Sequence, residues 1–447
     1  MTRRILVTLL RFAMRIYFRR VEVAGLENVP RTTPVIFVLN HPNALVDPVF
    51  LLCLAPRRVS FLAKAPLFKI PIIGFLVKAL DSLPVYRKQD EGEDVMRNQE
   101  TFLAARKLLA GGGTIGICPE GVSHDEPRLR PIKTGAARIA LGAVSTGEVS
   151  HLDIVPAGLY YTSKTSFRSA VLLYFGKPFP VVRADMEAGE NPDRAAVRAL
   201  SDQIEAAMRD VMLDAEHEEA LQTVSRAEKI FSIEGRDNTP DSLAEELQLQ
   251  QRFMKAYRIL REQAPDRLLR LELRMTRFEE ELNQAGVDWD TLSPPTSTLA
   301  VFSHLVTRSL LFLLLLGPAL LGAIVHYPAY RLGGYLSTRF SQGSDDVIST
   351  AKILSAMLLF PVTWFLVALV AYKFSSGIVA LMALLIIPIT GYAAIRFSEE
   401  VDRFFGGLRA LVFFLRRRRF FIRLMAERNA IRDEILALGD EAAIATQ

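Results

Sequence analysis

Three long segments without charged residues, in the last third of the chain, constrain its fold more than any other feature. They cover residues 309–330, 353–372 and 374–395. Each has about the 20 residues that a helix needs to cross the hydrocarbon core of a bilayer. Runs this apolar are poorly explained as buried helices of a large soluble core. The sequence therefore predicts that residues 301–397 form a transmembrane region with two or three spans.

The basic residues around these segments predict their orientation. Arg416-Arg417-Arg418-Arg419 follows the last segment, and such clusters favour the cytoplasmic side of a membrane. If the domain before the segments is also cytoplasmic, the number of crossings is even. One segment is then expected to be re-entrant or interfacial, and the sequence does not say which.

The part of the chain before residue 183 alternates strand-like and helix-like segments. Apolar runs typical of strands are separated by helical patterns such as residues 94–110. This alternation predicts an α/β domain over residues 21–182, with a mixed sheet flanked by helices. The predicted strands cover residues 35–39, 59–63, 114–118, 154–159 and 171–175.

Composition divides the rest of the chain into three further parts. Residues 183–300 are rich in Glu, Arg, Ala, Leu and Gln at helical spacing, which predicts a helical extension, and residues 398–447 read as a basic helical tail. Residues 1–20 mix arginines with apolar residues and lack an uninterrupted apolar run, so a signal peptide is not expected. They suit a basic amphipathic helix on an anionic membrane surface, although a helix packed on the domain would have the same pattern.

Several classes of function are disfavoured by the residues present. A net charge of +5 does not by itself indicate nucleic acid, and the basic clusters flank apolar segments. His41, His124 and His151 are scattered, and two cysteines without metal-ligand spacing do not predict a metal site. The two cysteines lie in apolar settings and read as buried free thiols. The chain contains no Gly-x-Ser-x-Gly motif, so a serine nucleophile is not predicted.

The motif most suggestive of chemistry is Asn40-His41-Pro42-Asn43, followed by Asp47, directly after the first predicted strand. A strand end presents an imidazole rigidly. A nearby carboxylate can bind one ring nitrogen and leave the other free as a base. His41 and Asp47 are therefore candidate catalytic residues. Alone, the pair is weak evidence, because a structural histidine is the commoner explanation.

Three later motifs strengthen this interpretation. They are Ser82-Leu83-Pro84-Val85-Tyr86-Arg87, Ile117-Cys118-Pro119-Glu120-Gly121 and Ile154-Val155-Pro156-Ala157-Gly158. With the histidine motif, this order resembles the four blocks of the phospholipid/glycerol acyltransferase family, over residues 11–181. Asn-His-Pro-Asn, Pro-Glu-Gly-Val-Ser and residues 131–139 are similar to the fungal-type glycerol-3-phosphate/dihydroxyacetone-phosphate acyltransferases. One departure is that five residues separate His41 from Asp47, where the family usually has four; in this longer spacing the chain again resembles the fungal-type branch.

The resemblance implies a role for each block. Arg can grip a phosphate with two hydrogen bonds, so Arg87 is the candidate phosphate ligand of the acceptor. The third block, Glu120 and Gly121, is implied in acceptor binding, and Lys133 in contact with phosphate or donor. Pro156 is expected to shape a turn beside the acyl site.

Together these features predict a membrane-bound O-acyltransferase with a cytoplasmic catalytic domain. It would move an acyl group from acyl-CoA or acyl-carrier-protein to glycerol 3-phosphate, with no cofactor besides this co-substrate. Dihydroxyacetone phosphate and lysophosphatidate remain alternative acceptors, the latter giving phosphatidic acid. A non-catalytic lipid-binding scaffold is the alternative from another class, but it would have no need of His41, Asp47, Arg87 and Glu120 together.

Overall fold

The computed structural model describes residues 2–87, 90, 95–187, 191–232, 242–286, 289, 298–341 and 344–444. The chain divides into two compact units. The first contains Met1–Glu216, Ser242–Leu247 and Phe340–Ile353. The second contains His217–Asp241, Gln248–Arg339 and Leu354–Gln447. Phe340–Ile353, which the sequence placed in the transmembrane region, thus belongs to the first unit.

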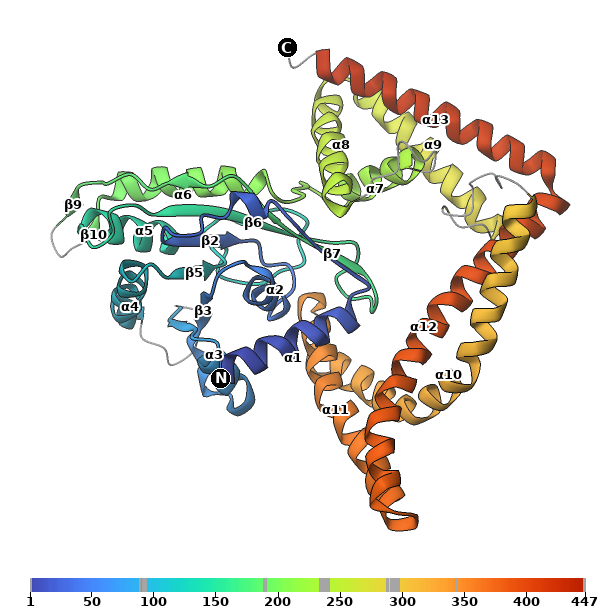
Figure 1. The fold of residues 1–447 in the computed structure, drawn as a ribbon. Helices are drawn as coiled ribbons and strands as arrows, with labels where there is room; N and C mark the ends of the chain where they lie inside the picture. Colours follow the sequence, from blue (N-terminus) through green and yellow to red (C-terminus); the bar gives the residue numbers. More distant parts are fainter. Residues whose placement is uncertain are drawn as a thin grey trace. The chain divides into compact units, whose positions relative to one another are not determined.

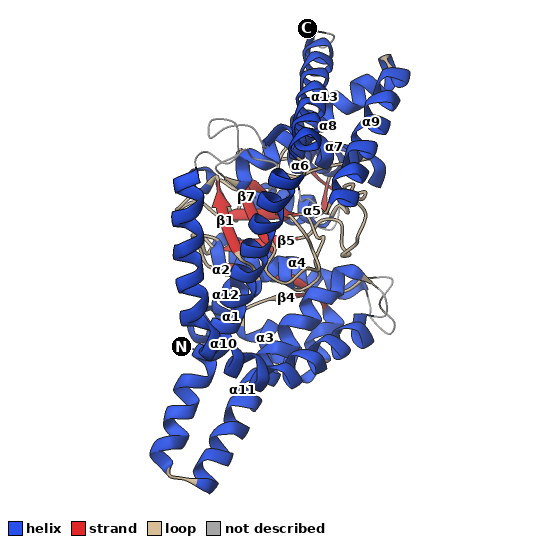
Figure 2. Cartoon of the chain, turned by 90° about the vertical axis from the view of Figure 1, so that its right-hand side faces the viewer, coloured by secondary structure: helices blue, strands red, loops and turns tan. Residues whose placement is uncertain are grey.

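The first unit is built on a mixed sheet, shown in Figure 1 and coloured red in Figure 2. Its spatial order is β1-β7-β6-β2-β5-β3-β4, with β8 paired to β6. The segment β6-β2-β5-β3-β4 is parallel throughout, whereas β7 and β8 run antiparallel to β6. The strands are β1 (Arg20–Ala24), β2 (Val35–Leu39), β3 (Val59–Lys64), β4 (Leu83–Val85), β5 (Thr114–Ile117), β6 (Asp153–Tyr161), β7 (Ala170–Phe175) and β8 (Phe179–Pro180).

Alternation along the buried strand β2 assigns its side chains to the two faces of the sheet. Ile36 and Val38 join the core formed with α4, α5 and α6. Phe37 points to the opposite face, where its ring lies 5.4 Å from that of Phe175. The helices of this unit are α1 (Thr2–Tyr17), α2 (Val46–Leu54), α3 (Pro71–Ala79), α4 (Asn98–Ala110), α5 (Gly135–Ser145) and α6 (Arg194–Arg209). Short 3-10 turns η1 (Leu26–Asn28), η2 (Ala65–Lys69) and η3 (Val95–Arg97) and a two-stranded ribbon, β9 (Met186–Glu187) with β10 (Asn191–Pro192), complete it.

Helix α1 has two apolar faces. Leu6, Leu10, Met14 and Tyr17 are buried against the domain, and Arg11 donates a hydrogen bond to the Cys53 carbonyl at 2.5 Å. A second set stays exposed on the same helix: Ile5, Leu9 and Phe12. The helix therefore packs on the domain and still presents apolar side chains outward.

The second unit contains a helical core in which segments from before and after the apolar helices meet. Met275 and Phe278 of α9 pack with Leu424 and Ile431 of α13. Arg274 forms ion pairs with Glu427 and Glu434, both at 2.7 Å. The helices are α7 (Glu218–Ser232), α8 (Leu243–Gln263), α9 (Pro265–Ala285) and α13 (Arg418–Ile444), with the first turn of α8 belonging to the first unit.

Three long helices carry the apolar segments: α10 (Thr298–Ser341), α11 (Asp345–Phe374) and α12 (Gly377–Arg416). Their apolar stretches, Ser309–Ser341, Asp345–Phe374 and Gly377–Asp402, are long and apolar enough to cross a membrane. Each helix contains proline. The predicted architecture, an α/β domain with a helical extension and a helical membrane region, is confirmed.

Candidate active site

Three predicted site residues, and Lys64, which the sequence analysis did not single out, lie at the ends of four neighbouring parallel strands. His41 comes after β2 and Glu120 after β5, and these two strands are paired. Lys64 ends β3 and Arg87 follows β4, the next two strands in the sheet. Because the carboxyl ends of parallel strands lie at one edge, the fold gathers blocks that are distant in sequence.

His41 and Asp47 form the predicted pair. The Nδ1 atom of His41 lies 2.9 Å from Oδ2 of Asp47, and a carboxylate only accepts, so Nδ1 carries the proton. Asp47 is fully buried in the first turn of α2. It also accepts hydrogen bonds from the Asn43 amide at 2.6 Å and from the Tyr161 hydroxyl at 2.6 Å. Three donors therefore fix this carboxylate, and Nε2 of His41 is left as the basic nitrogen.

The five-residue spacing does not prevent this geometry. Ala44, in the middle of the loop, has a φ of 35°, a left-handed value that residues other than glycine rarely adopt. The Asn43 amide turns back onto Asp47 and closes the loop. The loop between His41 and Asp47 thus contains one residue in the left-handed conformation and still brings the two side chains together.

Cys118 and Asp47 influence the protonation of His41. Burial of the imidazole lowers the pKa of His41, but the neighbouring Cys118 and Asp47 outweigh burial and raise that pKa well above its ordinary value. Burial raises the pKa of the Cys118 thiol. Both cysteines are free, as the sequence predicted.

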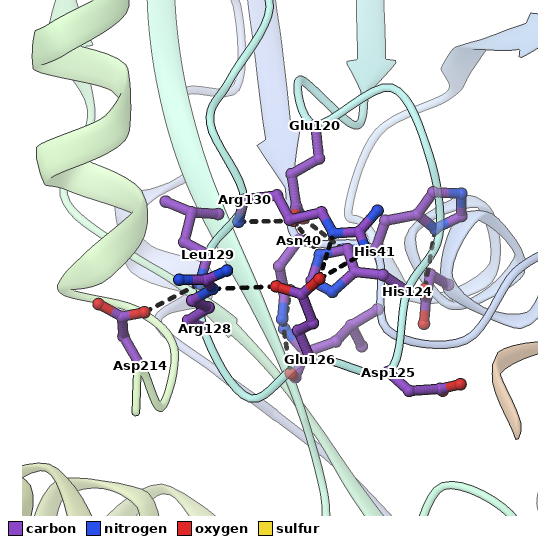
Figure 3. Close-up of polar contacts among 12 residues, drawn as sticks. Asn40, His41, Glu120, His124, Asp125, Glu126, Arg128, Leu129, Arg130 and Asp214 are labelled. Carbon is purple, nitrogen blue, oxygen red and sulfur yellow. Dashed lines mark hydrogen bonds and ion pairs between the residues drawn. The ribbon is translucent and has the colours of Figure 1, made fainter. Parts of the chain in front are cut away.

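Glu120 is directed inward and joins three segments (Figure 3). Its Oε1 accepts the backbone amide of His41 at 3.0 Å, and its Oε2 accepts that of Arg130 at 3.2 Å. Oε2 also pairs with Nε2 of His124. The His124 amide in turn donates to the His41 carbonyl at 3.3 Å. Glu120 thus fixes the backbone beside the base, while its predicted contact with substrate stays a prediction.

Arg87 binds a carboxylate in the way expected for a phosphate. Its Nε and Nη2 donate to Asp90 at 2.9 and 2.6 Å, and its Nη1 donates to the Gly121 carbonyl at 2.7 Å. The Arg87 guanidinium holds the pKa of Asp90 below its ordinary value, against the effect of burial, and Lys64 and Lys133 lower it further. Three cations therefore surround one anion at this edge.

Gly121 and Lys133 are in direct contact. Gly121 has a φ of 74°, and a Cβ atom there would lie 2.8 Å from Nζ of Lys133. Any side chain at position 121 would therefore displace this lysine.

Pro156 lies inside β6, paired with Val38, and not in the turn that the sequence suggested. On the other side of β6, Pro156 lies between two ladders, where its carbonyl accepts a hydrogen bond from the Gly176 amide at 2.9 Å. β8 pairs with Asp153 and Ile154, and β7 pairs only from Ala157 onward. A proline without an N–H fits between these two ladders. Its role in shaping an acyl site stays a prediction.

Sequence reasoning missed four residues around the base: Asn43, Cys118, His124 and Tyr161. Tyr161 ends β6, and its contact with Asp47 depends on β6 lying beside β2. Asn43 and Cys118 stood inside quoted motifs, so attention to neighbours of the base would have found them. Among the described residues, no three His, Cys, Asp or Glu side chains gather into a possible metal site.

Comparisons with known proteins place the chain among acyltransferases. The Acyltransferase family profile matches residues 20–160, which makes the unit with the His–Asp pair an acyltransferase domain. A second profile, the glycerol-3-phosphate acyltransferase 2 C-terminal domain, matches residues 236–443. Over both matched regions the chain is similar to the phospholipid/glycerol acyltransferase family and resembles its fungal-type members.

Individual relatives differ in how much of the chain they match. An uncharacterized acyltransferase of Schizosaccharomyces pombe is 24% identical, covering 88% of this chain and 74% of the relative. Glycerol-3-phosphate O-acyltransferase 1 of Saccharomyces cerevisiae is 25% identical, covering 78% of this chain and 58% of its own length. The chloroplastic 1-acyl-sn-glycerol-3-phosphate acyltransferase BAT2 of Brassica napus is 29% identical, over only 33% of this chain and 39% of its own length.

Proposed function

We propose that this protein is a membrane-bound enzyme that acylates glycerol 3-phosphate. The observation that carries the proposal is the pair of a partly exposed His41 and a buried Asp47 at the sheet edge that also holds Arg87. The acceptor follows from the extent of the matches. The yeast relative named for glycerol 3-phosphate matches 78% of this chain, which is more than the catalytic domain alone, whereas the lysophosphatidate relative matches 33% of it.

The chemistry needs no covalent enzyme intermediate. Nε2 of His41 takes the proton of the acceptor hydroxyl as its oxygen attacks the thioester carbonyl of acyl-CoA or acyl-carrier-protein. The new C–O bond forms, the C–S bond breaks, and the proton passes to the leaving thiolate. Asp47 stabilises the imidazolium between these steps and keeps Nδ1 protonated.

The phosphate of the acceptor would bind the cations at the same edge. Arg87 grips Asp90 with two nitrogens, and a phosphate oxygen pair can take the place of that carboxylate. Lys133 and Lys64 supply further positive charge. Glu120 and Gly121 complete this site through their contacts with the His41 backbone and the Lys133 side chain.

The membrane arrangement follows from the number of crossings, which must be even if the chain starts and ends on the same side. Helix α13 packs with α9, so the chain after the apolar helices returns to the side it left. The start of α11 belongs to the catalytic unit, and no apolar segment of spanning length precedes α10 among the described residues. We infer that α11 and α12 cross as a hairpin, while both ends of α10 lie on the catalytic side. The arginines at 416–419 make that side cytoplasmic, where α1 would lie on anionic lipid.

The test is an acyl-transfer assay of the full-length protein in nanodiscs, with radiolabelled acyl-CoA or acyl-carrier-protein as donor. The acceptors are glycerol 3-phosphate, dihydroxyacetone phosphate, lysophosphatidate and glycerol. We expect glycerol 3-phosphate to have the highest kcat/KM. Transfer to lysophosphatidate alone would reassign the acceptor, and no transfer to any acceptor would favour the scaffold.

The variant Arg87→Ala tests the phosphate site. Losing a charge-assisted contact costs about 1.5–3 kcal/mol, so the KM for glycerol 3-phosphate should rise roughly 10- to 150-fold, with little change for the donor. The control is Arg58→Ala, which also removes an arginine paired with an aspartate, Asp81. Arg58 precedes β3 and therefore lies at the opposite edge of the sheet. An equal change for both substrates would contradict the role given to Arg87.

A further inference from the structure

The start of the second apolar helix, α11, is hydrogen-bonded to the catalytic unit. Ser349 is fully buried, and its hydroxyl donates to the Lys164 carbonyl and lies 3.0 Å from the Tyr17 hydroxyl. Lys352 donates to the Thr165 carbonyl at 2.8 Å. These contacts stop where the uninterrupted apolar stretch begins, at Ile353. A membrane helix is thus tied to the loop between β6 and β7.

The same carbonyl group connects this helix to the catalytic loop. Lys164 O also accepts a hydrogen bond from the side-chain amide of Asn43 at 3.3 Å. Asn43 is fully buried, and its backbone amide holds Oδ2 of Asp47. Asp47 in turn binds His41 through that oxygen. One peptide carbonyl therefore lies between Ser349 and the residue that orients the carboxylate.

We propose that Ser349 is a positioning residue for the acyl transfer, acting through the Lys164 carbonyl and Asn43 on the His41–Asp47 pair. The inference rests on the proposed function, because its readout is turnover. Ser349 touches no reacting atom, so it affects the rate by keeping His41 and Asp47 in the orientation that the reaction needs. Its place on α11 makes the membrane region part of the catalytic apparatus and gives this helix a role beyond attachment.

A purely structural role for Ser349 would give a different kinetic pattern. A positioning residue should change kcat and leave the KM for acceptor and donor nearly unchanged, because no substrate contact is lost. It should also act only while Asn43 transmits its effect. A general loss of folding would lower the amount of active enzyme regardless of Asn43.

The experiment compares full-length Ser349→Ala with the wild type in nanodiscs, using glycerol 3-phosphate and radiolabelled donor. Active protein is quantified by detergent extraction and gel filtration. We expect kcat to fall on the order of 3- to 10-fold, the rate equivalent of one neutral hydrogen bond. Ser349→Thr, which keeps the hydroxyl, should restore most of the rate. The matched control is Thr350→Val, since the buried Thr350 hydroxyl has no hydrogen-bond partner among the described residues.

A double variant decides between the two roles. In an Asn43→Ala background, Ser349→Ala should cause almost no further loss of kcat, because both act through one carbonyl. Full additivity, or an unchanged kcat in Ser349→Ala, would overturn the proposal. If Ser349→Ala does not accumulate, Ser349→Cys takes its place, since a thiol is a weaker donor to the same Lys164 carbonyl. We expect a smaller fall in kcat, and an unchanged kcat there also overturns the proposal. An inactive wild type would instead refute the proposed function.

Discussion

At the scale of single residues, the proton balance of His41 governs the proposed reaction. The base must be neutral to accept a proton, yet Cys118 and Asp47 raise its pKa well above the ordinary value. A more basic imidazole is the stronger base, but a smaller fraction of it is neutral at neutral pH. The balance predicts an enzyme whose activity is limited on the acid side.

We expect kcat/KM for the acceptor to rise with pH across an apparent pKa well above that of an ordinary imidazole. Asp47→Asn removes an anion that raises this pKa, so the acid limb should move to lower pH and the plateau should fall. His41→Ala should reduce turnover on the order of 10²- to 10⁴-fold and abolish the limb. Initial rates across the neutral and alkaline range, at constant ionic strength, measure this. A wild-type limb at or below the ordinary histidine range would contradict it.

At the scale of elements, the backbone after α6 lies very close to β6, and this contact determines how that segment packs on the sheet. A Cβ atom at Gly158 would lie 1.8 Å from the Val211 carbonyl oxygen, which belongs to the segment after α6. Gly158 is also paired with Tyr174 of β7. The glycine therefore lets the chain after α6 lie directly on the strand that supplies Tyr161.

Gly158→Ala should destabilise the catalytic unit by about 1–3 kcal/mol or more, because backbone atoms must move to make room. Gly135→Ala is the control: it opens α5, and its nearest contact would be at 4.0 Å, with Ile117. Thermal unfolding of the two purified proteins in the same detergent measures the difference. Equal midpoints for both variants would mean that the segment after α6 shifts freely.

Much of this level could be predicted from the sequence. Runs such as 35–39 and 59–63 match β2 and β3 almost residue for residue, because short continuous apolar runs are typical of buried strands and are too short for most helices. The contacts between residues on different strands could not be predicted in the same way. That Tyr161 reaches Asp47, that Glu120 turns inward, and that Pro156 fits within a strand all depend on which strands pair.

At the scale of the whole molecule, the property most open to test is the side of the membrane on which each segment lies. The inferred hairpin of α11 and α12 places the turn at Ser375 and Ser376 across the membrane from the catalytic unit. Ser344 and α9 should both lie on the catalytic side. These positions are distant in sequence, so they report on different crossings.

Single cysteines at Ser376, Ser344 and Asn283, in a background lacking Cys53 and Cys118, should divide into two groups. In sealed vesicles with the catalytic domain outside, an impermeant maleimide should label Ser344→Cys and Asn283→Cys but not Ser376→Cys. Detergent should expose all three. Protection of Ser344→Cys alone would show that α10 crosses the membrane, and ready labelling of Ser376→Cys would show that the hairpin does not.

The left-handed backbone at Ala44 has a consequence for how such chains are recognised. The loop that contains Ala44 has five residues between His41 and Asp47 and still returns Asp47 to His41 at 2.9 Å. The reaction requires a short distance between the imidazole nitrogen and the carboxylate oxygen. The number of residues between the two can vary as long as the loop keeps that distance. A search that counts four intervening residues would pass over this chain. A search for a histidine after a buried strand, with an aspartate in the first turn of the next helix, would find it.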